Sequence, residues 1–160
     1  MLEYSVVIEK VMNIGLDRIN NNPEMKITEL FKEATGGELR TVHIIVYDDP
    51  DNGSRPKAVF KDDGKILWHQ GLAHRDGKIA KVSSPNYTVT YKITLSAWFR
   101  LISQQNTFRD LYWSDMFDAE GQYFFRDIVV WNRFWEQYKD VVKLSRLEKL
   151  MLVQKEEFAY

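Results

Sequence analysis

A chain of 160 residues is long enough for one domain that buries roughly two-thirds of the surface exposed by its unfolded form. It contains no Cys, which excludes disulfides, thiolate metal sites and a Cys nucleophile, and we expect a cytoplasmic location. Its 22 basic and 23 acidic residues give a net charge of -1, so we expect no nucleic-acid partner.

The first predicted element is an amphipathic helix over residues 2–19. Its apolar residues recur every 3.6 positions, opposite a charged face. The run NNNPE, at residues 20–24, ends this helix, because Asn favours caps and Pro cannot continue a helical ladder. A second, short helix is predicted to begin at Thr28 and to end at Gly36 and Gly37, where a left-handed cap has no steric cost.

Strands are predicted over residues 41–83. The stretch LRTVHIIVYDD is rich in β-branched residues, and the turn-forming PDNGSRP separates it from KAVFK. Two Asp-Gly pairs, Asp63–Gly64 and Asp76–Gly77, are typical of two-residue hairpin turns, which require positive φ at both central positions. We therefore expect an antiparallel meander.

The clearest strand pattern is NYTVTYKITL, at residues 86–95. Aromatic and β-branched residues at the odd-numbered positions from Tyr87 to Ile93 alternate with Thr and Lys at the even-numbered positions. One face of this strand is therefore predicted to be buried. Ser96 follows as the expected cap of a helix that runs through Ile102.

Helices and one more strand are expected after this join. Thr107 is predicted to cap a helix that runs through Asp118, and Gly121 precedes the extended stretch QYFF. Asp127 is predicted to cap a third helix.

Residues 139–160 are predicted to form a terminal amphipathic helix, which follows a domain of residues 1–138. Packing on that domain, a homodimer contact and a transient membrane contact are the alternatives for its apolar side, since basic amphipathic helices bind anionic surfaces. No apolar run approaches the roughly 20 residues that span a bilayer, and the first residues lack the positive charge of a signal peptide.

The order of these elements resembles that of the sterol carrier protein type 2 family, the non-specific lipid-transfer fold. The most specific part of the likeness is TVTYKITLSAWFRLI, in which a Thr-rich strand passes into a helix. The next is MFDAEGQYFFRD, with a Gly before a short strand, and the likeness covers roughly residues 2–138. The resemblance implies an α+β fold with an antiparallel five-stranded sheet covered on one side by helices.

The resemblance also implies a lipid tunnel between the sheet and the C-terminal helices. The segment Thr107–Trp135, which is dense in aromatic residues, would lie there. Apolar walls suit a lipid, because most of its stabilisation comes from area removed from water, about 25 cal/mol per Å². The candidate wall residues, chosen by position and type, are Trp98, Ile102, Phe108, Tyr112, Trp113, Phe117, Phe124, Trp131 and Trp135.

We therefore expect a binding or carrier protein for a fatty acid, an acyl-CoA or a sterol-like molecule, with no catalytic residue and no cofactor. The alternative for the aromatic segment is an ordinary filled core, since large rings also fill two-layer domains. Two other function classes stay open. One is an enzyme that acts on a small apolar substrate through Asp115 or a Tyr, and the other is a protein-interaction module with a filled core.

The remaining ionisable residues fit simpler roles. Asp110 and Asp127 are expected at helix starts, where a negative charge is favourable, and Asp118 and Glu120 show no convincing acid–base pairing. His43, His69 and His74 have no metal-binding spacing, so we expect no metal.

Overall fold

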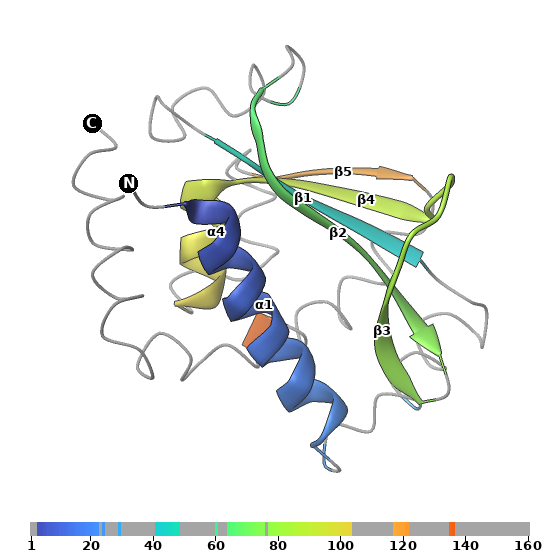
Figure 1. The fold of residues 1–160 in the computed structure, drawn as a ribbon. Coiled ribbons are helices and arrows are strands. Elements are labelled where there is room, and N and C mark those ends of the chain that lie inside the picture. Colours follow the sequence, from blue (N-terminus) through green and yellow to red (C-terminus); the bar gives the residue numbers. More distant parts are fainter. Residues whose placement is uncertain are drawn as a thin grey trace.

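The computed structural model of the chain describes residues 3–22, 24, 29, 41–48, 60, 64–75, 77–103, 117–121 and 135–136. Within them, the elements are α1 (Tyr4–Asn20), β1 (Thr41–Tyr47), β2 (Ile66–Arg75), β3 (Lys78–Val82), β4 (Val89–Thr94), α4 (Leu95–Ile102) and β5 (Phe117–Gly121). Figure 1 shows α1 and α4 together on one side of the strands. The predicted α+β arrangement, a five-stranded sheet with helices on one side, is confirmed.

The strands form one mixed sheet in the order β3-β2-β1-β4-β5. The pairs β1–β2, β2–β3 and β4–β5 are antiparallel, so residues 41–82 contain the predicted meander. Strands β1 and β4 run parallel. The prediction of a purely antiparallel sheet is wrong in this pair.

The parallel pair follows from the short connection between β3 and β4. Val82 ends β3 opposite Gly71 of β2, which is itself paired with His43 near the start of β1. Residues 83–88 have to cross three strand spacings, about 14 Å in all, to reach the other edge of β1. A segment that reaches roughly 20–25 Å when extended favours a start of β4 near the level of Val82, and β4 begins beside Val42 and runs in the direction of β1.

Alternate residues of the strands define two faces of the sheet. The helix face packs against α1 and α4 and holds the apolar core. On β1 and β4 this face consists of Val42, Ile44, Val46, Val89, Tyr91 and Ile93, which are all at most 1% exposed. The opposite side is called the far face, and on β1 it consists of Thr41, His43, Ile45 and Tyr47.

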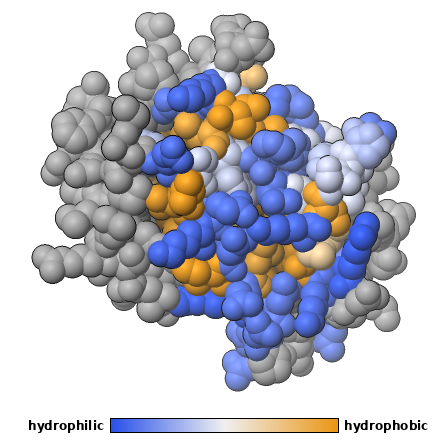
Figure 2. Space-filling view, in the orientation of Figure 1, coloured by the Kyte–Doolittle hydropathy of each residue, from blue (hydrophilic) through white to orange (hydrophobic). Residues whose placement is uncertain are grey.

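Helix α1 confirms the predicted amphipathic helix, with small shifts at its two ends. Its buried residues are Ile8, Val11, Met12, Gly15, Leu16 and Ile19. Figure 2 shows hydrophilic side chains crossing this side of the molecule, with hydrophobic patches between them. Within the described residues, no helix is both long and apolar enough to span a membrane.

Two polar side chains of α1 attach it to the sheet. Glu9 accepts hydrogen bonds from the Trp68 indole N–H of β2 and from the Lys81 ammonium of β3, the latter at 2.6 Å. Asn20 donates from Nδ2 to the Ile79 carbonyl and accepts from the Ile79 N–H at Oδ1, both at 2.8 Å. These contacts fix the middle and the end of α1 against β2 and β3.

The predicted hairpin between β2 and β3 is confirmed by the pairing of its flanking residues. Arg75 and Lys78 are paired across it, and Gly77 has a φ of 78°, in the region that the predicted turn requires. The other turns and elements predicted at residues 25–40, 49–59, 61–63, 104–116 and 122–134 lie outside the described residues, as do residues 137–160.

Helix α4 begins directly at the end of β4, without a loop. Thr94 is its N-cap, because the Thr94 Oγ1 accepts a hydrogen bond from the Ala97 N–H at 3.1 Å. The prediction that Ser96 caps this helix is therefore wrong by two residues, and Ser96 lies in its first turn. Thr94 takes the role because it keeps an extended backbone while its hydroxyl reaches the third residue along.

Strand β5 contradicts the prediction that Phe117 and Asp118 end a helix. Phe117 is paired with Ile93 and Ala119 with Tyr91, so both lie on the helix face. Asp, Ala and Glu give the segment little strand propensity of its own, but pairing with β4 and burial of Phe117 outweigh it. The residues after Gly121, where the strand was predicted, are not described.

Candidate hydrophobic-ligand site

Four of the nine candidate wall residues are described, and they lie in one apolar cluster. Trp98, Ile102, Phe117 and Trp135 are 0%, 1%, 3% and 2% exposed. Two of them come from α4, one from β5 and one from a position further along the chain. The other five, which lie outside the described residues, are Phe108, Tyr112, Trp113, Phe124 and Trp131. A ligand-binding role for all nine stays a prediction.

Trp98 joins α4 to α1 inside this cluster. Its indole Nε1 donates to the Met12 sulfur at 3.5 Å, so the polar atom of a fully buried ring has an acceptor. Its ring also contacts that of Phe99, with centroids 5.3 Å apart. Because the Thr94 cap fixes the start of α4, Trp98 is held four residues beyond the end of β4.

Phe117 of β5 is part of the described cluster. Its ring contacts that of Tyr91, with centroids 5.3 Å apart and planes inclined by 46°. Tyr91 is absent from the candidate set, although its alternation in β4 placed it on the buried face. Tyr91 could have been identified from the sequence, because it lies between Val89 and Ile93 on the face of the strand that was predicted to be buried.

The cluster is poor in ionisable groups. In the part of the chain that the structure describes, no Asp, Glu, His, Lys or Arg is buried. Its polar atoms include the Trp98 indole N–H and the Tyr91 hydroxyl, and both of these side chains are fully buried. Such an environment stabilises an apolar molecule by burial and offers no described acid–base pair.

The acidic residues expected near the rings are partly accounted for. Asp118 and Glu120 are exposed on β5, and the Glu120 carboxylate lies 2.7 Å from the Lys92 ammonium, away from the cluster. Glu120 raises the pKa of Lys92 above its usual 10.5. Asp110, Asp115 and Asp127 lie outside the described residues.

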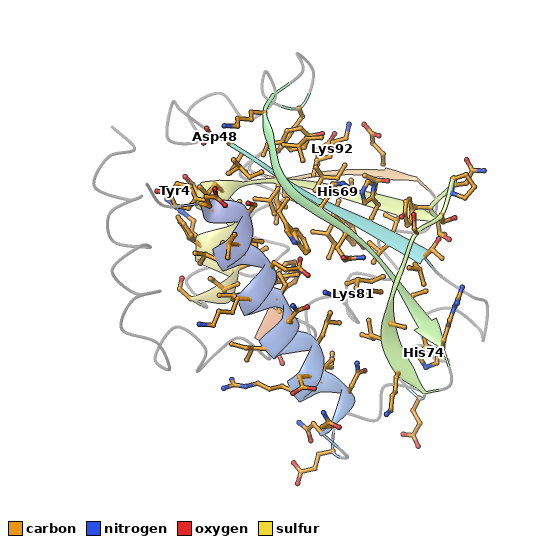
Figure 3. The ribbon with its side chains drawn as sticks, viewed as in Figure 1. Tyr4, Asp48, His69, His74, Lys81 and Lys92 are labelled. Carbon is orange, nitrogen blue, oxygen red and sulfur yellow. The ribbon has the colours of Figure 1, made fainter. Side chains whose placement is uncertain are left out.

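Glu9 is a carboxylate that contacts a residue of the cluster, because it accepts a hydrogen bond from the Trp68 indole. Hydrogen bonds from Lys81 and Trp68 lower the pKa of Glu9 below its usual 4.5 and outweigh the opposing effect of burial. The charged carboxylate of Glu9 therefore holds α1 against β2 and β3. Figure 3 shows Lys81 directed into the space between α1 and the strands.

The three histidines do not come together. His43 and His69 meet on the far face, whereas His74 lies on the side of Ile79, towards α1. Burial of its ring, and then the neighbouring His69, lower the pKa of His43 below its usual 6.5. Among the described residues, no group of three or more His, Asp or Glu could hold a metal ion.

No protein-family model and no curated protein matches the chain. Among solved structures it is similar to sterol carrier protein 2 from Yarrowia lipolytica in its apo form, at 14% identity and a TM-score of 0.48, over 86% of this chain and 94% of that one. The sterol carrier protein domain 2 of Helicoverpa armigera is similar at 13% identity and a TM-score of 0.49, over 82% and 87%.

A ubiquinone synthesis protein, UbiJ-SCP2, is similar at 15% identity and a TM-score of 0.46, over 84% of this chain and 92% of that one. These structures bear the family name that the join at residues 93–102 suggested from sequence. The likeness, at 13–15% identity, concerns the fold alone.

Proposed function

We propose that the chain is a small binding protein for a hydrophobic molecule. The ligand, a fatty acid, an acyl-CoA or a sterol-like molecule, would occupy an apolar cavity between the helix face and the C-terminal helices. The nine candidate wall residues would line it. Catalysis is not part of the proposal, which uses only the burial of apolar surface at the described residues of the cluster.

One observation carries this proposal. Four residues selected from the sequence as wall positions, Trp98, Ile102, Phe117 and Trp135, belong to a single apolar cluster on the helix-covered face of the sheet. The cluster draws on α1, α4, β4 and β5, so a ligand bound among them would contact several elements at once. Removal of its apolar area from water would supply about 25 cal/mol per Å².

The proposal extends to exchange of the ligand. We place the protein in the cytoplasm and assign to residues 139–160 a transient membrane contact, through which cargo would enter and leave. A basic amphipathic helix suits this role, because its lysines attract anionic lipid headgroups while its apolar side enters the interface. A homodimer through the same segment is the competing role.

A second function, a protein-interaction module with a filled core, is favoured by the close contacts among the rings. Trp98 touches Phe99, Tyr91 touches Phe117, and all four are at most 4% exposed. Rings packed in this way bury their apolar surface against one another. Under this alternative the apolar cluster would stabilise the fold and bind nothing.

Native mass spectrometry of the purified full chain separates the two functions. A carrier is expected to retain a lipid-sized adduct, or to take up one equivalent of a fluorescent fatty acid that palmitate displaces. An interaction module is expected to appear ligand-free and to ignore the fatty acid at submillimolar concentration. The second result would end the carrier proposal.

A pair of matched substitutions gives a sharper test. Ile102→Phe adds a ring at a candidate wall position, whereas Ile8→Phe adds the same ring at an equally buried position in α1. If a cavity borders Ile102, its variant should lose fatty-acid binding at least tenfold and keep its stability. The Ile8 variant should be destabilised by about 1–3 kcal/mol through overpacking. Equal destabilisation of both, with no binding by the parent, favours the filled core.

A further inference from the structure

On the far face, away from the apolar cluster, we propose a two-histidine site for a divalent first-row transition-metal ion, formed by His43 of β1 and His69 of β2. The ion would lie between His43 Nε2 and His69 Nδ1, which face each other at 3.1 Å. Imidazole nitrogens are preferred ligands of Zn²⁺, Ni²⁺ and Cu²⁺. The site does not depend on the function proposed for the helix face.

The spacing of the two nitrogens fits a shared ion. Nitrogens bound at about 2.0–2.1 Å to one metal lie about 2.9 Å apart at a right angle and about 3.4 Å apart at the tetrahedral angle. The observed 3.1 Å lies between these values. The two rings are also nearly perpendicular, at 83° with centroids 5.2 Å apart, so they are not stacked and an ion can enter from the side.

Strand pairing holds both rings in position. His43 is paired with Gly71, and Ile45 is paired with His69, so the two histidines are diagonal neighbours on one face. Tyr87, from the connection that crosses the sheet, stacks on His43 with centroids 4.6 Å apart and planes inclined by 21°. Its phenol oxygen accepts a hydrogen bond from the Ser84 N–H at 3.2 Å. The His43 ring is therefore oriented before any ion arrives.

Gly71 makes this stacking sterically feasible. A Cβ atom at Gly71 would overlap both the Tyr87 phenol and the Val82 carbonyl oxygen. The absence of a side chain there lets Tyr87 lie close over β2 and reach His43. The connection between β3 and β4 thus crosses the sheet and also supports the His43 ring.

Without an ion, the two nitrogens share a hydrogen bond, in which one ring donates and the other accepts. Binding requires a lone pair on both nitrogens, so the donating ring has to move its proton to its other nitrogen. This change of tautomer needs no net loss of protons from two neutral rings. The ion would replace the hydrogen bond between the two rings and lie to one side of the line that joins the two nitrogens.

The remaining ligands of the ion would be water. No third His, Asp or Glu of the described residues joins the pair as a ligand. His69 is exposed and His43 is partly exposed, so solvent has access to the site. Such a site binds and releases an ion readily, unlike a structural zinc site with four protein ligands.

Titration of the tag-free full chain with Zn²⁺, followed by calorimetry, tests the proposal. We expect one equivalent to bind, and His43→Gln and His69→Gln each to weaken binding at least tenfold. His74→Gln is the matched control, because it removes the same group from the same strand, and it should change affinity less than twofold. Figure 3 shows His69 and His74 well separated along β2. Binding unaffected by both His43→Gln and His69→Gln, or no binding by the parent chain, would overturn the proposal.

A second measurement needs no variant, so it stands even if a substitution impairs folding. Electron paramagnetic resonance of the parent chain with one equivalent of Cu²⁺ should show splitting from two equatorial nitrogens. A single coupled nitrogen would contradict the paired site.

Discussion

The two faces of the sheet differ in chemistry along the first part of β1, although Ile45 and Tyr47 are buried on the far face further along. On β1, Val42, Ile44 and Val46 are apolar and nearly fully buried, whereas Thr41 and His43 point to the other side and are only partly buried. The helix face forms one continuous apolar cluster. On the described far face, individual polar contacts link neighbouring segments, such as Thr41 with Thr88 and Lys92 with Glu120.

The difference shows that a strand can serve two roles at once. Because successive side chains point to opposite sides, stability can be concentrated on one face while the other is left for specific contacts. Substitutions of similar size should therefore have unequal effects on the two faces. The predictions below test this, in order of decreasing expected effect.

Trp98→Ala should have the largest effect, because it removes a fully buried ring and its hydrogen bond to Met12. We expect the free energy of unfolding, measured by urea denaturation, to fall by about 3–5 kcal/mol. Thr90→Ala on the far face of β4 is the comparison and should cost less than about 1 kcal/mol. Equal losses would show that the two faces do not differ in this way.

Gly71→Ala should be next, with a loss of about 1–3 kcal/mol in the same measurement. The added methyl group would overlap Tyr87 and the Val82 carbonyl oxygen. In a Tyr87→Ala background the loss should shrink but persist, because the backbone overlap with Val82 remains. Full rescue by Tyr87→Ala would locate the strain in the side chain alone.

The attachment of α1 should weaken in acid. The folded-state pKa of Glu9 is lowered, so its contribution is complete above the usual 4.5 and is lost as the pH falls through the folded value. The carboxylate is 40% exposed, so we expect no more than about 1 kcal/mol. The difference in unfolding free energy between the parent and Glu9→Gln should shrink between pH 6 and pH 3. A constant difference would mean that the charge of Glu9 is irrelevant.

The smallest effect is expected for Lys92→Met on the far face. The pair with Glu120 is partly solvated, since Glu120 is 58% exposed, and such pairs contribute about 0.2–1 kcal/mol. The loss relative to the parent should diminish in 1 M NaCl, because salt screens the pair. A larger loss that salt does not change would point to packing of the Lys92 stem.

Much of the fold could be predicted from periodicity. The helical stripe of α1, the alternation in β4 and the hairpin between β2 and β3 each reflect local chemistry, and all three are confirmed. The parallel pairing of β1 and β4 could not be predicted in this way, because it depends on how far residues 83–88 must reach across the sheet.

The errors at Ser96 and Phe117 share one cause. Both were assigned from local preference, whereas β4 determines the structure of its neighbours: it supplies the Thr94 cap, and it pairs with β5. Among the candidate wall residues, Trp98 and Phe117 lie in the apolar cluster, which also contains the unselected Tyr91, and their role in ligand binding stays a prediction. The meeting of His43 and His69 was also missed, since it depends on strand register.

The Asn20 amide has a consequence for self-assembly. Strand β3 is at the outer edge of the sheet, where free N–H and C=O groups could template a strand from another molecule. Asn20 occupies the N–H and the C=O of Ile79, in the manner of one residue of an additional strand. A single side chain at the end of α1 thereby occupies one of the positions on this edge at which a strand of another molecule could pair.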